Sequence, residues 1–168
     1  MTGEVHIRWI TRARPKIDRI ACPWLIRRYI DPESVFYFVP PDQVTRLAQF
    51  LDAIPFDVEG VELTHAGAGS SFDAFLAKYQ LTEPALLRLA VIVRGADTAR
   101  LDLAPECAGL LAVSLGLSHN HRDDQEMLLR GLEVYDALYS WLRFAQAEQH
   151  SWPPASQSAI PSVPPVPH

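Results

Sequence analysis

Hydrophobic residues occupy every second position at the start of the chain, where Val5, Ile7 and Trp9 are each separated by one residue. This two-residue period predicts a strand at 5–11 with one buried face. The aromatic and β-branched stretch at 34–40 predicts a second strand, and residues 61–64 predict a third. The pattern therefore favours a small sheet of about three strands, formed mostly by the N-terminal third of the chain.

The helical period dominates the remaining sequence. Helices are predicted at 17–30, 41–54, 72–79, 82–94, 104–117 and 123–150. The last is the strongest, because a continuous apolar stripe runs from Met127 to Ala145 and two aspartates stand at its positive N-terminal end. The sequence thus predicts an α+β fold in which five or six helices, including a long C-terminal one, pack on the sheet.

Several residues indicate where these helices begin and end. Ser71 and Thr82 are expected to cap the helices that follow them, and Gly116 is expected to end the helix before it. Pro23 lacks a backbone N–H and is tolerated best in a first turn, so the regular part of the first helix is expected to begin only at about Ala21 or Cys22.

The C-terminal segment differs in composition from the rest of the chain. Residues 150–168 are rich in proline, serine and alanine, which predicts a disordered tail. Residues 1–149 have a length and apolar content that suit one folded domain. No apolar run approaches membrane-spanning length and no leader pattern appears, so we expect a cytoplasmic protein without membrane contact.

Positive charge is concentrated near the N-terminus of a chain whose net charge is -5. Seven of the 15 basic residues lie between positions 8 and 28, and they are Arg8, Arg12, Arg14, Lys16, Arg19, Arg27 and Arg28. Most are arginines, which suit fork-like contact with an oxyanion. An acidic protein with a compact arginine group favours a small anion over a long phosphate backbone.

Four residues of this group are candidates for anion binding. Arg12 and Arg14 alternate on the connection after the first strand, and Lys16 and Arg19 lie near the start of the next helix. Guanidinium groups beside the free N–H groups of a helix start can form an oxyanion site. Arg27 and Arg28 lie in the last turn of that helix, where cations suit the helix dipole, so we expect them to stabilise the helix end.

Cys22 and Cys107 are the two cysteines, with no CxxC spacing, so reduced thiols are expected. Cys22 is a redox candidate, because a thiol at a helix start near cations has a lowered pKa. Its apolar neighbours favour the alternative, a small buried side chain, and the same holds for Cys107.

His65 follows the predicted third strand and opens the glycine-rich loop HAGAGSS. At a strand end it can donate to an oxyanion, act as acid or base, or ligate a divalent metal. Asp18 and Asp97 are weaker metal candidates. The stretch HNHRDDQE at 119–126 also combines histidines with acids, but acids are common at a helix start and two histidines in a loop are not specific.

The stretches TRARPKIDRIACPWLIRR, PFDVEGVELTHAG, SFDAFLAKY and EMLLRGLEVYDALYSW resemble the C-terminal domain of the bacterial chromate-resistance regulators. The resemblance runs from about Arg8 to Trp141. It implies a stress-response regulator domain that responds to chromate, with Arg12, Arg19 and His65 as the residues of an oxyanion site. Full regulators carry an N-terminal DNA-binding region, so direct nucleic-acid binding is not expected here without a partner chain.

Three functions remain open at this point. The first is a sensor or resistance domain that binds a chromate-like or sulfate-like oxyanion. The second is a small enzyme, either metal-dependent through His65 with Asp18 or Asp97, or a thiol-redox or sulfur-handling enzyme through Cys22, although no P-loop, Rossmann or HExxH motif occurs. The third is an interaction module that meets a protein partner or a second copy of the chain.

Overall fold

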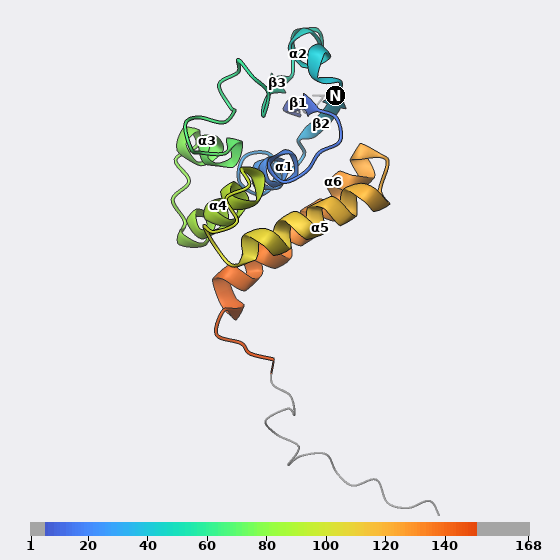
Figure 1. The fold of residues 1–168 in the computed structure, drawn as a ribbon. Helices are drawn as coiled ribbons and strands as arrows, with labels where there is room; N and C mark the ends of the chain where they lie inside the picture. The colour runs from blue at the N-terminus through green and yellow to red at the C-terminus, as the bar shows by residue number, and fades with distance from the viewer. Residues whose placement is uncertain (1–5, 151–168) are drawn as a thin grey trace, which may run out of the picture.

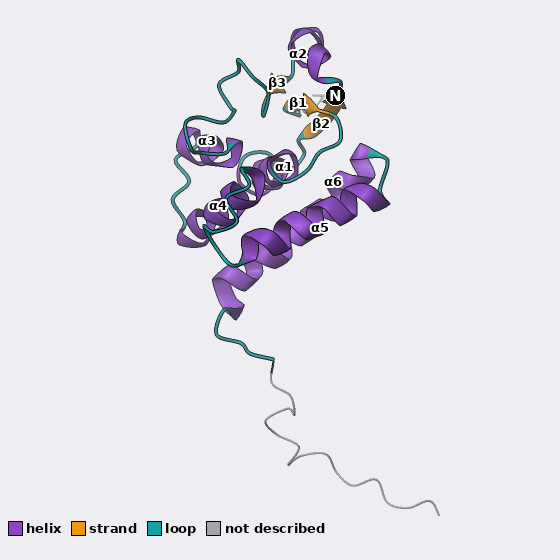
Figure 2. Ribbon diagram, viewed as in Figure 1, coloured by secondary structure: helices purple, strands orange, loops and turns teal. Residues whose placement is uncertain are grey.

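The structure is a computed structural model that describes residues 6–150 of the 168-residue chain. Val5 of the predicted first strand and residues 151–168 of the predicted tail lie outside these residues. The strands are β1 (Arg8–Arg12), β2 (Val35–Val39) and β3 (Ile54–Pro55), and the helices are α1 (Asp18–Tyr29), α2 (Val44–Leu51), α3 (Ser71–Lys78), α4 (Pro84–Asp97), α5 (Glu106–Asn120) and α6 (Asp124–Ser140). The predicted α+β fold is confirmed (Figures 1 and 2).

The sheet is parallel, in the order β2-β1-β3, so β1 lies at its centre. Trp9, Ile10 and Thr11 have no exposed surface, and the prediction of one buried face was wrong. Ile10 packs with Val44 and Ala48 of α2 on one face, while Trp9 joins the larger core on the other. Helices cover both faces of the sheet, as is usual for parallel strands (Figure 1).

The third strand lies earlier than predicted. It is Ile54–Pro55, which pairs with Trp9 and Ile10, and not the stretch at 61–64. Leu63 from that stretch forms one isolated bridge to Phe56. A proline cannot donate to a ladder, so Pro55 is tolerated because β3 is a short edge strand. The next acidic residue, Asp57, consequently stands just past the carboxyl end of β3.

Helix α1 is the centre of the larger core, between the sheet and the other helices (Figure 1). It begins at Asp18 and contains Pro23 in its interior, so the predicted late start was wrong. The proline removes one backbone hydrogen bond. Eight of the helix's twelve residues are buried against α3, α4 and α6, and such packing outweighs a local propensity.

Two predicted helix caps are displaced by one residue. The cap of α3 is Ser70, whose N–H donates to the Asp73 carboxylate at 2.8 Å, and Ser71 is the first helical residue. The cap of α4 is Glu83 in place of Thr82, and Pro84 occupies the first turn. The displacement matters at α3, because it leaves the Ser71 side chain available for another contact.

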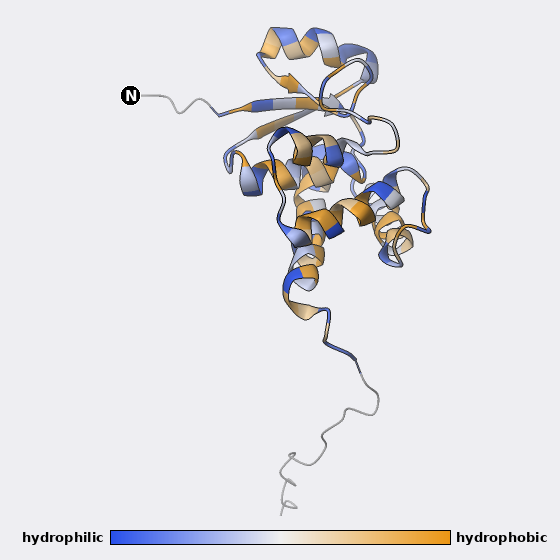
Figure 3. Ribbon diagram, turned by 90° about the vertical axis from the view of Figure 1, so that its left-hand side faces the viewer, coloured by the Kyte–Doolittle hydropathy of each residue, from blue (hydrophilic) through white to orange (hydrophobic). Residues whose placement is uncertain are grey.

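Helices α5 and α6 form a hairpin beneath the rest of the fold (Figures 1 and 3). Helix α5 continues through Gly116 to Asn120, so His119 lies in its last turn and not in a loop. The two aspartates predicted at the start of the last helix are confirmed, with Asp123 as the cap of α6. No helix within residues 6–150 has the length and hydrophobicity required to cross a bilayer.

The α1–α6 contact depends on a glycine. A Cβ atom added at Gly131 of α6 would lie 2.5 Å from Cγ2 of Ile20, a buried residue of α1. The absence of a side chain therefore lets α6 approach the helix whose first residue is Asp18.

We predict that Gly131→Ala lowers the free energy of unfolding by about 1–3 kcal/mol, since an added methyl group overpacks the core. In an exposed helix the same change would stabilise by about 1 kcal/mol. Urea denaturation measures the effect. The matched control is Gly131→Ala in an Ile20→Ala background, where the clash is gone and the loss should disappear; an equal loss in both backgrounds would refute this account of the contact.

Candidate functional site

Asp18 is the first residue of α1, and its side chain has no exposed surface. Its carboxylate accepts the backbone N–H of Ser71 at 2.6 Å and that of Phe72 at 3.3 Å. These are the first two residues of α3, so the carboxylate occupies the positive N-terminal end of that helix. Asp18 thus ties the start of α1 to the start of α3.

Asp57 lies just past β3, with its side chain 4% exposed. It accepts hydrogen bonds from Ser71 Oγ at 2.7 Å and from Arg12 Nη2 at 2.9 Å, and it pairs with Arg19 Nε at 3.3 Å. Arg12 ends β1, and the carboxyl ends of parallel strands share one edge of a sheet. The sheet itself therefore brings Arg12 and Asp57 together.

His65 joins these carboxylates to a third one. Its Nε2 atom lies 3.2 Å from Asp18 Oδ2, 3.3 Å from Asp57 Oδ1 and 3.0 Å from Asp97 Oδ2. Asp97 is the last residue of α4. We call these four residues the His–Asp cluster; they come from α1, the segment after β3, the loop before α3 and the end of α4.

The electrostatics of the His–Asp cluster follow from three carboxylates around one imidazole. The hydrogen bond with Asp18 raises the pKa of His65 to about 9. Burial, and then repulsion from Asp18 and Asp57, raises the pKa of Asp97 to about 7. Burial also raises the pKa of Asp18. His65 therefore stays protonated near neutral pH and Asp97 is partly protonated, because burial and mutual repulsion leave the carboxylates short of compensating positive charge.

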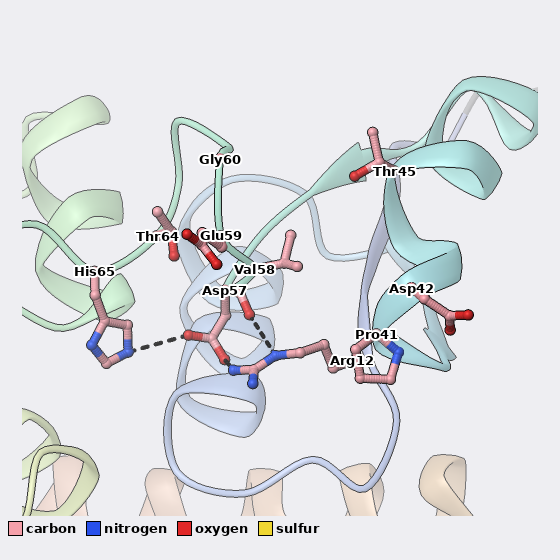
Figure 4. A pocket seen from close by; sticks show the side chains of 10 residues that line it. All are labelled: Arg12, Pro41, Asp42, Thr45, Asp57, Val58, Glu59, Gly60, Thr64 and His65. Atoms are coloured by element: carbon pink, nitrogen blue, oxygen red, sulfur yellow. Dashed lines mark hydrogen bonds and ion pairs between the residues drawn. The ribbon is translucent and has the colours of Figure 1, made fainter.

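A pocket of about 800 Å³ opens beside the cluster (Figure 4). Asp57 lies between Arg12 and His65 in its wall, and Asp42 and Glu59 are among the other lining residues. Dissolved ions can thus reach the cluster from this side, where the His65 side chain is 40% exposed.

The structure brings some of the predicted anion-binding residues together and separates others. Arg19 joins Arg12 at Asp57, and its Nη1 also donates to the carbonyl oxygens of Arg12 and Ala13, at 3.1 and 2.8 Å. Arg14 turns away, because its Nη1 donates to the Arg122 carbonyl at 2.7 Å beyond α5. Lys16 is half-buried in the connection before α1.

Arg27 and Arg28 lie at the end of α1, remote from this group. The Arg27 guanidinium stands 5.2 Å from the centroid of the Phe36 ring. Arg28 stands 4.9 Å from that of Tyr139 and pairs with Asp136 at 3.2 Å. Both arginines therefore pack on aromatic rings, consistent with the expected role at a helix end.

Of the potential metal ligands, Asp18, Asp57 and His65 offer donor atoms that all lie within 4.8 Å of one another. The HNHRDDQE stretch forms no such group among residues 6–150. There His121 pairs with Glu126 at 3.1 Å, and Asp123 accepts the N–H of Glu126 as the helix cap. Asp123 and Glu126 therefore stabilise the start of α6.

Both cysteines are fully buried. Burial, followed by repulsion from Asp18, raises the pKa of the Cys22 thiol well above its usual range. The start of α1 was expected to be cationic and to lower this pKa, but its first residue is the buried acid Asp18. Cys22 is therefore held as a thiol in the core.

Sequence reasoning missed Asp57 and Ser71. Asp57 would have emerged from a correct third strand, because the residue after β3 must lie near the end of β1. Ser71 was predicted to be a helix cap, whereas its N–H donates a hydrogen bond to Asp18 and its hydroxyl donates one to Asp57. No local pattern signals this double role, since both carboxylates are distant in sequence.

Comparisons with known proteins cover nearly all of this fold. The family model of the ChrB C-terminal domain matches residues 9–142. The chain is also similar to Protein ChrB of Cupriavidus metallidurans, with 35% identity over 133 residues, which are 79% of this chain and 40% of that protein. The chain thus matches less than half the length of this curated relative. No solved structure matches the chain.

We predict that the metal-free protein loses stability as the pH rises from 5 to 9. Asp97 and His65 have pKa values near 7 and 9 in the fold, above their unfolded values of 3.8 and 6.5, so the folded state binds more protons over this range. Asp97 should account for most of a fall of about 2 kcal/mol, because one pKa unit corresponds to about 1.4 kcal/mol and water screens the exposed His65.

Urea denaturation in EDTA at several pH values measures this fall. Asp97→Asn removes the titrating carboxyl and should flatten the profile between pH 5 and 7. Asp102→Asn is the control, because Asp102 is exposed and pairs with Arg100 and with no member of the His–Asp cluster. An unchanged profile in Asp97→Asn would contradict the assignment.

We also predict that a thiol probe such as DTNB reacts with neither cysteine in the native protein, since Cys22 and Cys107 are both buried. Both thiols should react at once in denaturant. If one thiol of the native protein reacts rapidly in buffer and the Cys22→Ser variant does not react, Cys22 is again a candidate for redox chemistry.

Proposed function

Because the chain belongs to the ChrB C-terminal domain family, as its sequence resemblance predicts, we propose that this domain acts in chromate resistance as a cation-dependent oxyanion-binding domain. Asp18, Asp57 and His65 hold a divalent cation, and a tetrahedral oxyanion such as chromate binds that cation from the pocket. The observation that carries the proposal is the meeting of His65 Nε2 with three carboxylates beside an open pocket that His65 and Asp57 line.

The spacing of the donor atoms supports a cation. Neighbouring ligands of an octahedral ion at about 2.1 Å are separated by about 3 Å. The distances from His65 Nε2 to the three carboxylates, 3.0–3.3 Å, fall near this separation. A set of carboxylate oxygens with one imidazole suits manganese, iron or zinc, whereas calcium prefers six to eight oxygens.

The charge balance explains why the anion requires the cation. Arg12 and Arg19 both direct N–H groups at Asp57, so their charge is largely compensated. The pocket wall adds Asp42 and Glu59. A dianion in this pocket without a cation would face several carboxylates at close range, which opposes binding. A bound cation reverses that balance and offers an open coordination position.

Arg12 is the second anchor for the oxyanion. Its Nε and Nη2 are engaged with Asp57, and its side chain is 38% exposed along the pocket. Its remaining N–H groups can donate to an anion bound on the cation. Arg14 takes no part, because its guanidinium is bound at the end of α5. The anion-binding residues predicted from the sequence are thus reduced to Arg12, Arg19 and His65. The proposed site also includes a divalent metal, which the sequence had suggested only for the hypothesis of a metal-dependent enzyme.

Binding, and not reduction, is the function that we propose. Reduction of chromate needs an electron donor, and the side chains of the His–Asp cluster are an imidazole and carboxylates. Both thiols of the chain are buried in the core. Release of bound oxyanion, or a signal passed to another protein, suits a resistance domain without a redox step.

For the cation, we predict that EDTA-treated protein binds one Mn²⁺ per chain in isothermal titration calorimetry. Asp18→Asn and His65→Gln each remove a ligand and should weaken binding by at least tenfold, whereas Asp102→Asn should leave it unchanged. The Mn²⁺ electron paramagnetic resonance signal gives an independent readout of bound ion. Undiminished binding in both ligand variants would refute the site.

For the oxyanion, we predict that chromate and sulfate bind saturably to the Mn²⁺-loaded protein and not to the EDTA-treated protein. Arg12→Gln should weaken anion binding roughly tenfold while one Mn²⁺ still binds, since a charge-assisted hydrogen bond contributes about 1.5–3 kcal/mol. Equal anion affinity with and without Mn²⁺ would overturn the role of the cation. Mn²⁺ binding without any anion binding would overturn the oxyanion function alone.

A further inference from the structure

Helix α5 presents an uncharged face to solvent. No charged residue lies between Glu106 and His119, where the sequence reads CAGLLAVSLGLS. Its exposed residues are Ala108, Gly109, Ala112, Val113, Leu115 and Gly116. Val113 and Leu115 are 46% and 49% exposed. A helix that needs only to cover a core carries polar residues on its outer face, so this face is unusual for a surface that meets only water.

An apolar groove continues this face onto the neighbouring helix. The groove has a volume of about 440 Å³, lies between α5 and α6, and contains a single charged residue, Glu106, at one end. Val113 lines it from α5, and Val134 and Leu138 line it from α6, with Trp141 just past the end of α6. The uncharged face and the groove together form one continuous apolar surface.

We propose that this surface is the two-fold interface between two copies of the chain, with α5 packed antiparallel against α5 of the second copy. The charges at the two ends of the helix select this occupant and this direction. Glu106 stands in the first turn of α5 and His119 in the last, followed by Arg122. In an antiparallel pair, Glu106 of each copy faces the basic end of the other, whereas a parallel pair would place like groups together.

The positions along α5 are also self-complementary in the antiparallel direction. A two-fold axis near Ala112 and Val113 places Gly109 of one copy opposite Gly116 of the other. A Cβ atom added at either glycine would meet no atom within 4 Å, so both face open space and permit close approach of the helices.

The expected dimer is of moderate affinity. Helix α5 has 15 residues and is therefore about 22 Å long. Contact along one such helix and the adjacent groove falls toward the small end of specific interfaces, where weak and transient association is common. The interface leaves the pocket of the His–Asp cluster open, because none of its lining residues lies on α5 or α6. The inference is therefore independent of the proposed function.

Sedimentation velocity of the full chain between about 1 and 200 μM tests the dimer. The native protein should shift from monomer to dimer over this range, and Val113→Glu should remain monomeric at the highest concentration. Leu129→Glu is the matched control, because Leu129 is 58% exposed on α6 and lies outside the groove. A monomeric native protein at 200 μM, or equal loss of dimer in both variants, would overturn the proposal. Thermal unfolding verifies that each variant folds.

A charge exchange tests the antiparallel direction. His119→Glu places an acid opposite Glu106 and should weaken the dimer at least severalfold, while His119→Glu combined with Glu106→Lys should restore it. Oxidation of Ala112→Cys should give a covalent dimer through the position near the axis, whereas Leu129→Cys should not. A dimer that persists without either result would refute the antiparallel α5 contact.

Discussion

The buried carboxylate of Asp18 is the constraint on which the arrangement depends. A desolvated charge is costly unless hydrogen bonds and opposite charges compensate it. Two N–H groups at the start of α3 and the imidazole of His65 provide that compensation. The need to compensate this charge holds the start of α1 against the start of α3. It also holds the loop that carries His65 beside the Asp18 carboxylate. The same carboxylate repels Asp57 and Asp97, so the stabilising contact also creates the cluster's shortage of positive charge.

Sheet topology determines which basic groups accompany that shortage. Because β1 is the central strand of a parallel sheet, Arg12 at its end lies beside the segment that follows β3. Arg19, the second residue of α1, reaches the same carboxylate. The arginines thus compensate Asp57, whereas the other carboxylates of the His–Asp cluster remain short of positive charge. A bound cation would supply that charge and would then attract an anion, and this is the physical link between the two parts of the proposed function.

The sequence predicted the type of most elements because their burial is periodic along the chain. The aromatic run at 34–40 predicted β2 to within one residue at each end. The apolar stripe predicted the start of α6 correctly, but it placed the end of the helix at 150 and not at Ser140. The third strand was missed because two residues, one of them proline, carry no period. The start of α1 was missed because packing against other helices outweighs Pro23. For the site, His65 and Arg12 were selected by residue type and position at predicted strand ends, whereas Asp57 depended on the missed strand.

The sequence by itself determined the family, the α+β class and the concentration of arginine near the N-terminus, since each is a property of local pattern and composition. Only the tertiary structure decided what those arginines face. Asp18, Asp57 and Asp97 are far apart in the chain, and their convergence on one imidazole follows from parallel strand ends and packed helix starts. Long-range contacts of this kind leave no period in the sequence, because each carboxylate is locally only one more polar residue at the end of an element.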